Sequence, residues 1–410
     1  MFAPCSSRPV ADPPALRHRS ARKFDKVLHA QGLVGRVVEL PDSTRTAADA
    51  ARSIGCELRQ IVKSLVFEAG PSRGPVLVLA SGANRVDEEW MARYVGARLE
   101  RAHPETARSV TGYAIGGVPP SGHATPIPTF IDLDLLEHTE VWAAAGHPNA
   151  VCRLDSKELL TLSRGRPVPV TPSGDAEGRS APWITFDCYG TLVDWREGFL
   201  QVADRLGFAK TAAERQRLFH HYLEVEPACE APPYRRYRDV MADALIRAGR
   251  SMGLEISTDA ARLLPESVPE WPVFPDVAAS FESLRQGGLR LGILSNIDRD
   301  LIDRALARNG MRIDRVITSE DVRSYKPAPP HWARFLKESG ASPESVVHAS
   351  GSYEYDLETA KLFGLRTVYV SRYGPPPPGR QIDAIVQGLQ DLVGSKLLTT
   401  AFNGSGPAAG

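Results

Sequence analysis

A short apolar strand ends abruptly in a polar, glycine-containing turn in the stretch WITFDCYGTL, residues 183–192. Similar strand and turn units recur at 290–296, 345–352 and 367–370. Helical patterns lie between these units, as in DVAASFESLRQGG and DLETAKLFG. Strands that alternate with helices predict a parallel sheet covered by helices on both faces, and therefore an α/β fold.

Polar residues follow the ends of three of these strands, namely Asp187, Ser295 and Ser352. Functional sites of parallel sheets lie just beyond the carboxyl ends of the strands, so these residues predict the site. The block 196–270 interrupts the alternation with the helical patterns GFLQVADRLG, TAAERQRLFHHYLEVE and YRRYRDVMADALIRAG. An all-helical insertion directly after the first strand predicts a cap over the site.

Four ordered motifs carry a resemblance over residues 183–390: FDCYGTLVDW, ILSN, SYKPAPPHW and ASGSYEYDLETAKLFGL. They are similar to the motifs of the haloacid dehalogenase superfamily, which implies a Rossmann-like domain with a helical cap. The pattern Asp-x-Tyr-Gly-Thr-Leu more narrowly resembles the L-2-haloacid dehalogenase branch and its azetidine-2-carboxylate hydrolases. These enzymes displace a group from carbon C2 of a small carboxylic acid.

Two positions separate this chain from the phosphatases of the superfamily. Those enzymes carry a second Asp where this chain has Tyr189, and many carry an Asp where it has Gly351. A tyrosine, with a reference pKa of about 10, is a poor substitute for a carboxylic acid that protonates a leaving oxygen. Mg²⁺ also prefers several oxygen ligands. We therefore expect chemistry without a metal or another cofactor.

The resemblance implies a role for each matching residue. Asp187 is the expected nucleophile, whose ester is then hydrolysed by water. The other expected catalytic residues are Thr191, Ser295, Asn296, Lys326 and Asp356, with Tyr189 and Ser352 lining the substrate pocket. Plainer readings stay open: Thr191 caps a turn, and Ser295 with Asn296 ends a strand. Tyr353 and Tyr355 are expected to be packing residues and not site residues.

One departure concerns the cap. The dehalogenases carry a cap-helix Arg that helps to bind the halide or the substrate carboxylate. The corresponding helix of this chain places Phe219 or His220 near that position. Arg217, Arg235 and Arg238 are nearby in sequence without being clearly equivalent. The sequence thus leaves the leaving group and the stereochemistry at C2 open.

The first half of the chain mixes helical and strand patterns, which predicts an α+β domain with a mixed sheet. Its segments IVKSL (61–65), GGVPP (116–120) and GHPN (146–149) resemble the YbaK/prolyl-tRNA-editing family of aminoacyl-tRNA deacylases. Family members remove wrong amino acids from tRNA, commonly tRNA(Pro), without a metal or a protein nucleophile.

The resemblance assigns the positive charge of Lys63 to the tRNA phosphate or terminal ribose. Backbone amides at Gly116, Gly117 and Gly146 would hold the ester and its oxyanion. His147 belongs to the same substrate-binding loop, although a Gly-His-Pro sequence is more often a turn than a catalytic site. The alternative for Lys63 is an outward-facing lysine on a strand.

Composition fixes the broad class. The 410 residues include 49 Lys plus Arg and 49 Asp plus Glu, so the formal net charge is zero. The overall charge of the chain therefore gives no indication of nucleic-acid binding. No apolar run reaches the roughly 18 residues of a membrane span. The five scattered cysteines form neither a disulfide framework nor a metal pair, which suits a cytoplasmic location. We expect a tail at 1–22, domains at 23–163 and 183–395, a linker at 164–182 and a flexible end at 396–410.

Together the halves predict a bifunctional hydrolase whose partners are aminoacyl-tRNA and a small carboxylic or amino acid. One toxic proline analogue, such as azetidine-2-carboxylate, would provide substrates for both domains: the free compound for one and its ester with tRNA for the other. This inference rests on the fusion of the two domains alone. The alternatives are an (S)-2-haloacid dehalogenase, or a small-molecule phosphatase with a tRNA-binding module that does not catalyse. The sequence leaves the oligomeric state open.

Overall fold

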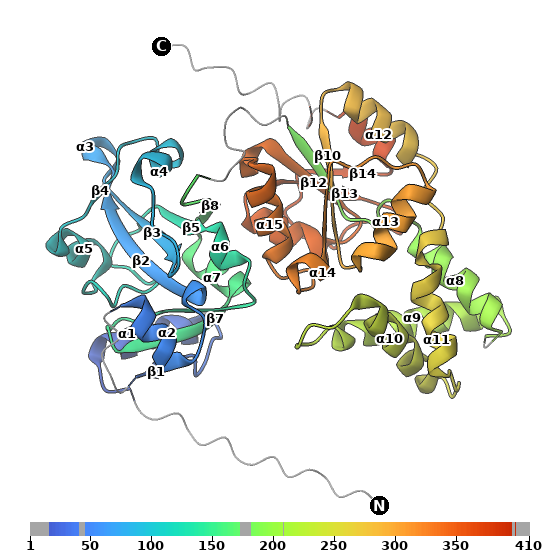
Figure 1. The fold of residues 1–410 in the computed structure, drawn as a ribbon, viewed down its shortest axis with the longest axis horizontal. Coiled ribbons are helices and arrows are strands. Elements are labelled where there is room, and N and C mark those ends of the chain that lie inside the picture. Colours follow the sequence, from blue (N-terminus) through green and yellow to red (C-terminus); the bar gives the residue numbers. More distant parts are fainter. Residues whose placement is uncertain (1–15, 41–45, 173–181, 208, 396–397, 399–410) are drawn as a thin grey trace, which may run out of the picture. The chain divides into compact units, whose positions relative to one another are not determined.

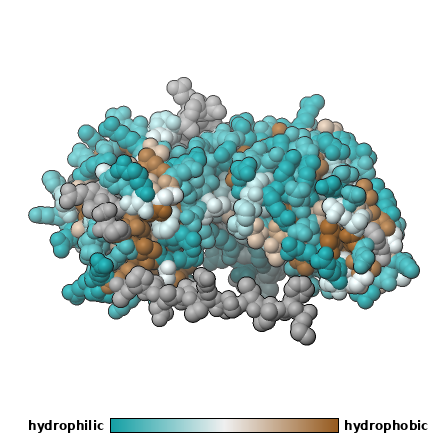
Figure 2. All heavy atoms as spheres, turned by 60° about the horizontal axis from the view of Figure 1, so that its bottom comes forward, coloured by the Kyte–Doolittle hydropathy of each residue, from teal (hydrophilic) through white to brown (hydrophobic). Residues whose placement is uncertain are grey.

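The computed structural model describes residues 16–40, 46–172, 182–207, 209–395 and 398. The chain forms two compact units that divide near residue 165 (Figure 1). The first contains a mixed sheet and the second an entirely parallel sheet. This confirms the predicted fold class of both halves. No described helix is both long and apolar enough to cross a membrane. Hydrophilic side chains dominate the surface seen in Figure 2, with small hydrophobic patches between them.

The sheet of the first unit has eight strands in the order β1-β7-β6-β2-β3-β5-β8, and β4 pairs with β2. Strand β2 runs antiparallel to β3 but parallel to β6, which makes the sheet mixed. The strands are β1 Val37–Glu39, β2 Ile61–Glu68, β3 Pro75–Ser81, β4 Glu100–Arg101, β5 Thr129–Asp132, β6 Glu140–Ala144, β7 Ala150–Asp155 and β8 Arg166–Val168.

Local signals in the sequence explain the helices of this unit. Helix α2 begins where the Thr46 side chain accepts a hydrogen bond from the backbone of Asp49, and it ends at Gly55 in the left-handed conformation. Asp87 and Gly96 bound α4 in the same way. The helices are α1 Arg19–Ala30, α2 Ala47–Ile54, α3 Gly70–Arg73, α4 Glu88–Val95, α5 Pro104–Thr111, α6 Leu133–Leu136 and α7 Ser156–Ser163.

The sheet of the second unit has six parallel strands in the order β11-β10-β9-β12-β13-β14. They are β9 Trp183–Phe186, β10 Arg290–Ser295, β11 Arg315–Thr318, β12 Val346–Ser350, β13 Arg366–Val370 and β14 Ala384–Val386. Every residue of β9 and β12 is buried, as expected for central parallel strands. Because β9 lies between β10 and β12, Asp187 emerges in the middle of the carboxyl edge.

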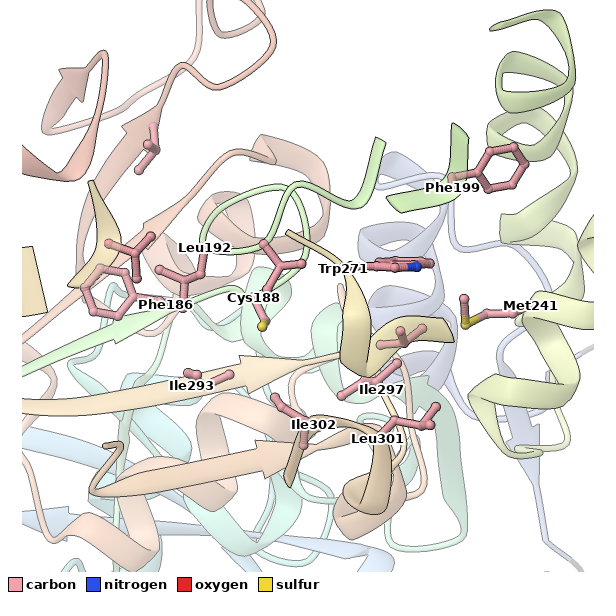
Figure 3. Packing of buried hydrophobic residues seen from close by; sticks show 14 of the residues in the cluster. Phe186, Cys188, Leu192, Phe199, Met241, Trp271, Ile293, Ile297, Leu301 and Ile302 are labelled. Carbon is pink, nitrogen blue, oxygen red and sulfur yellow. The ribbon is translucent and has the colours of Figure 1, made fainter. Parts of the chain in front are cut away.

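Helices α12 Val277–Gln286 and α15 Pro330–Ser339 both pack on β10. The other described α-helices that alternate with the strands of this sheet are α13 Arg299–Arg308, α14 Ser319–Val322, α16 Glu358–Leu362 and α17 Leu389–Val393. Figure 3 shows the core around the first strand and turn, where Phe186, Cys188 and Leu192 lie near Ile293 and Ile302. This packing holds the turn after β9 in place.

Four helices form the predicted cap: α8 Trp195–Leu206, α9 Ala212–Cys229, α10 Tyr237–Ser251 and α11 Thr258–Ser267. Helix α10 packs against both α9 and α11. The Trp271 ring packs closely against α8 because residue 198 is a glycine. A Cβ atom at Gly198 would lie 2.2 Å from this ring. Trp271 and Met241 belong to the same buried cluster (Figure 3).

The expected flexible segments differ from the structure in part. Helix α1 begins at Arg19, within the expected tail 1–22, because Ala21 and Phe24 bury their side chains. Strand β8 lies within the expected linker 164–182, where the proline-rich sequence adds an edge strand to the mixed sheet. Residues 1–15 and 173–181, and all of 396–410 except Leu398, lie outside the described residues.

Candidate active sites

Asp187 lies directly after β9, at the carboxyl edge of the sheet, and the residue is 9% exposed. A tight turn follows it, in which the Leu192 amide donates to the Cys188 carbonyl. The turn brings Thr191 back toward Asp187, so that the Thr191 hydroxyl donates to Asp187 Oδ2 at 3.0 Å. The Gly351 amide donates in turn to Thr191 Oγ1 at 2.9 Å. Thr191 therefore orients the carboxylate in addition to stabilising the turn.

Lys326 lies between two carboxylates and is 2% exposed. Its Nζ atom is 2.7 Å from Asp187 Oδ1 and 2.6 Å from Asp356 Oδ1, and it also donates to the Leu294 carbonyl. Burial disfavours its charge, but the two carboxylates outweigh burial and raise the pKa of Lys326. Burial raises the pKa of Asp187, and Lys326 and Thr191 oppose that rise.

Asp356 belongs to a π-helical turn, Tyr353–Leu357, that follows β12. Its Oδ1 atom also lies 3.1 Å from His348 Nε2, and its Oδ2 atom accepts from the Ser350 hydroxyl at 3.0 Å. Burial opposes the charge, yet the contacts with Lys326 and His348 hold the pKa of Asp356 at about 2. Such a weak base, with both oxygens engaged, is suited to orienting Lys326.

A cavity of about 420 Å³ opens beside Asp187. Seven of the predicted residues line it: Asp187, Tyr189, Ser295, Asn296, Lys326, Ser352 and Asp356. Thr191 reaches the site through its bond to Asp187. Ser295 is 1% exposed, and Asn296 accepts from the Lys326 amide at 2.7 Å. The structure thus brings all eight predicted residues of this half together.

The cap supplies cavity residues that the sequence analysis missed: Trp195, Tyr222, Leu223, Glu226, Pro227, Glu230, Tyr237, Met241 and Trp271. The stretch LEVEPACE on the cap helix was the available signal, since carboxyl groups four positions apart share a helix face. Tyr355, expected to be a packing residue, also lines the cavity. Tyr353 is buried beside Tyr369.

No cap residue considered for the missing arginine lines the cavity. Phe219 packs inside the cap against Phe199, and His220 is exposed. Arg235 pairs with Asp243 at 2.8 Å. Arg238 donates to Asp298 Oδ2 at the same distance. Arg217 is likewise outside the cavity lining.

The residues around Asp187 fit a Mg²⁺ site poorly. Asp187 and Asp356 both contact the Lys326 ammonium group. This group already neutralises the negative charge that would otherwise attract a metal cation. A Cβ atom at Gly351 would lie 2.6 Å from the Gly190 carbonyl oxygen, so an acidic side chain there requires the backbone to shift. Among the described residues, no group of three His, Cys, Asp or Glu side chains could hold a metal ion.

In the first unit, Lys63 lies on β2 and is partly buried. Its ammonium group donates to the carbonyls of Gly82, at 3.2 Å, and Asn84. The Asn84 side chain donates to Asp132 at 2.8 Å. Burial lowers the pKa of Lys63, and burial raises that of Asp132 to about 6. Lys63 is therefore held by the loop after β3 and does not simply face outward.

The two glycine loops of this unit contact each other. The Gly146 amide donates to the Gly117 carbonyl at 2.9 Å, and a Cβ atom at Gly117 would lie 2.8 Å from His147 Cα. Gly116 has a φ of +84° that favours glycine. His147 Nδ1 accepts from the Asn149 amide at 3.1 Å, and its ring stacks on His18. The His147 ring thus accepts a hydrogen bond from within its own loop.

These features define a two-domain α/β hydrolase with a buried Asp-Lys-Asp site under a helical cap. The family model of the aminoacyl-tRNA editing domain matches residues 41–162, and that of the haloacid dehalogenase-like hydrolases matches residues 182–364. The chain therefore belongs to the haloacid dehalogenase-like hydrolases and carries an aminoacyl-tRNA editing domain at its N-terminal side.

Similar proteins match one half each. (S)-2-haloacid dehalogenase 4A of Burkholderia cepacia is 30% identical over 199 residues, which cover 47% of this chain and 84% of that protein. Uncharacterized protein YwhH of Bacillus subtilis is 32% identical, covering 31% of this chain and 80% of that protein. A solved structure described as a putative trans-editing enzyme for prolyl tRNA synthetase is 47% identical, covering 38% of this chain and 99% of that one, with a TM-score of 0.37.

Proposed function

We propose that the capped domain displaces a group at C2 of a small carboxylic acid through an ester on Asp187. The observation that carries this proposal is the placement of Asp187 between Lys326 and Thr191 at the wall of the cavity. An ammonium ion and a hydroxyl fix the two carboxylate oxygens, so the nucleophile is oriented before the substrate arrives.

The reaction has two balanced steps. In the first, an Asp187 oxygen forms a bond to C2, and the leaving group departs with the electron pair of its bond to C2. In the second, water adds to the ester carbonyl of Asp187, the acyl–oxygen bond breaks, and a 2-hydroxy acid is released. Lys326 stabilises the negative charge that develops at Asp187, and Asp356 keeps Lys326 in position.

Ser295 ends β10 at the edge of the cavity, and its hydroxyl would bind the substrate carboxylate. The Asn296 side chain is already bonded to Glu230 and to the backbone of Lys326, so it would hold the cavity wall in place. Ser352 and Tyr189 would limit the space beside C2. A phosphatase reaction is less compatible with this site, because Tyr189 replaces the general acid and Gly351 lies against a backbone carbonyl.

For the first domain, we propose deacylation of mischarged aminoacyl-tRNA, with tRNA(Pro) as the first candidate. The contact between the loops of Gly116–Gly117 and Gly146 supports this assignment, because it brings the two motif loops to one place. The Gly117 and Gly146 amides donate to the carbonyls of Ala114 and Gly117, so they would have to release these partners to bind an oxyanion. Lys63 would bind the phosphate or ribose of the tRNA end. The similarity to a protein described as a putative trans-editing enzyme directs the choice of tRNA to be tested first.

A proline analogue with a cleavable C2 bond would serve both domains, and azetidine-2-carboxylate is such a compound. A 2-haloacid is the second candidate, favoured by the similarity to the Burkholderia cepacia dehalogenase. Among the described residues that line the cavity, however, no arginine is present to bind a halide.

The test is a substrate screen of the full chain with azetidine-2-carboxylate, 2-chloropropionate and a set of phosphate esters. The expected product from the first is 4-amino-2-hydroxybutanoate, formed by wild-type protein and not by Asp187→Asn. Chloride release from 2-chloropropionate alone would establish the haloacid alternative. Phosphate release that requires added Mg²⁺ would overturn the proposal.

A further inference from the structure

Two glutamates of the cap form part of the cavity wall opposite the strand ends. Glu226 lies in the last turn of α9, and Glu230 follows the end of the helix four residues later. Residues four positions apart lie on one helix face, so both carboxyl groups face the same cavity. Glu226 is 7% exposed, which makes this wall both acidic and buried.

The carboxyl groups are bound by neutral partners. Glu226 accepts a hydrogen bond from the Tyr237 hydroxyl. Glu230 Oε1 accepts from Asn296 Nδ2 at 3.3 Å, and the same amide nitrogen donates to the Lys326 carbonyl at 3.1 Å. Among the described residues, neither glutamate forms an ion pair with a lysine or arginine. Glu230 is thereby anchored to the strand end that carries the catalytic groups.

The local environment disfavours the state in which Glu226 and Glu230 are both ionised. Burial raises the pKa of Glu226. Burial and the neighbouring Glu226 raise the pKa of Glu230 to about 9. The pair therefore holds at least one proton near neutral pH. Burying carboxyl groups without a cation costs free energy, and a bound cation would recover part of that cost.

The rest of the cavity also suits a cation. The rings of Trp195, Tyr222 and Trp271 line it, and aromatic faces attract ammonium groups. Lys326 is the one cationic side chain in the described lining, and two carboxylates already neutralise it. The Ser295 hydroxyl lines the same space and has no hydrogen-bond partner among the described residues. A zwitterion would match both groups, with its carboxylate at Ser295 and its nitrogen at the glutamates.

We infer that Glu226 and Glu230 bind the ammonium nitrogen attached to the reacting carbon, and so select cyclic amino acids over 2-haloacids. This inference rests on the proposed attack of Asp187 at C2. When the C2–N bond breaks, its electron pair stays on the nitrogen, which becomes a neutral amine. The proton held by the glutamate pair then transfers to that amine. Hydrolysis of the ester by water regenerates the Asp187 carboxylate and releases one proton, which restores the glutamate pair.

Binding of two unreactive probes to the full chain tests the selectivity. L-Proline carries a charged ring nitrogen, and tetrahydrofuran-2-carboxylate carries a neutral ring oxygen at the same position. By calorimetry we expect wild-type protein to bind L-proline roughly tenfold or more tightly than the oxygen analogue, a preference of about 1.4 kcal/mol or more. The double variant Glu226→Gln, Glu230→Gln should reduce the preference to about twofold or less, because glutamine keeps the shape and removes the charge.

Glu224→Gln is the matched control, since Glu224 lies on the same helix but is exposed and pairs with His221. It should retain the wild-type preference, and circular dichroism should show that all variants are folded. Equal binding of the two probes to wild-type protein, or an unchanged preference in the double variant, would overturn the inference. A failure of C2 hydrolysis alongside a normal proline preference would instead refute the proposed function and leave the ammonium site standing.

Discussion

Replacing Lys326 by Met tests the central ion pairs most directly, because methionine keeps most of the side-chain volume and removes the charge. Two buried carboxylates, at 2.7 and 2.6 Å from Nζ, would lose their counter-ion. The pKa of Asp356 at about 2, against an ordinary value of 3.8, corresponds to about 2 kcal/mol of stabilisation. Breaking a buried pair from one side costs about 3–5 kcal/mol, so we expect a loss in that range at neutral pH.

The loss should depend on pH in a defined direction. Because the folded-state pKa of Asp356 lies below its unfolded value, its stabilisation is complete above about pH 4 and disappears as the pH falls toward 2. In the variant, both carboxylates would instead bind protons more tightly than in the unfolded chain. The difference between wild type and variant should therefore be smaller at pH 4.5 than at pH 7.5.

Urea unfolding of the full chain, followed by tryptophan fluorescence at both pH values, measures this difference. Lys361→Met is the matched control, because Lys361 forms an ion pair with Asp383 in which both side chains are about one-third exposed. A surface pair of this kind contributes about 0–1 kcal/mol. A Lys326→Met variant as stable as the control at pH 7.5, or a loss that is independent of pH, would refute the assignment of a buried charged triad.

Three further experiments address the chemistry. Asp187→Asn should abolish C2 hydrolysis, and a single wild-type turnover in H₂¹⁸O should label the Asp187 carboxylate; label in the first-turnover product would make water the nucleophile. Lys63→Ala should slow deacylation roughly tenfold or more through loss of a charge-assisted contact, with exposed Lys26→Ala as the control; an unchanged rate would remove Lys63 from the site. EDTA should not inhibit C2 hydrolysis, and inhibition reversed by Mg²⁺ would favour the phosphatase alternative.

The strand ends were predictable because a parallel sheet brings the carboxyl ends of its strands to one edge. Asp187, Ser295 and Ser352 could thus be placed together without knowing any distance. The resemblance implied that Asp356 orients Lys326 or the water, and its contact with Lys326 depends on the π-helical turn after β12, which turns its carboxylate inward. No periodic pattern in the sequence announces such a turn.

The cap side of the cavity was not predictable in the same way. Which helix face covers the strand ends depends on how the cap packs, and Gly198 allows Trp271 an approach that the sequence does not reveal. The resemblance implies an arginine on the cap helix, whereas the cap side of the cavity carries the carboxyl groups of Glu226 and Glu230. Acidic residues on a helix usually face solvent, and these two are distinguished by burial alone.

The proposed substrate gives a physical reason for joining the two domains. Azetidine-2-carboxylate is smaller than proline by one ring methylene, and a binding pocket distinguishes one methylene by only about 1–3 kcal/mol. A synthetase that discriminates by binding alone therefore charges a measurable share of the analogue. Hydrolysis of the free analogue lowers the amount available for charging, and deacylation removes the ester that still forms. Because the two steps act in sequence, their discrimination factors multiply, so each domain can be moderately selective while the pair protects translation.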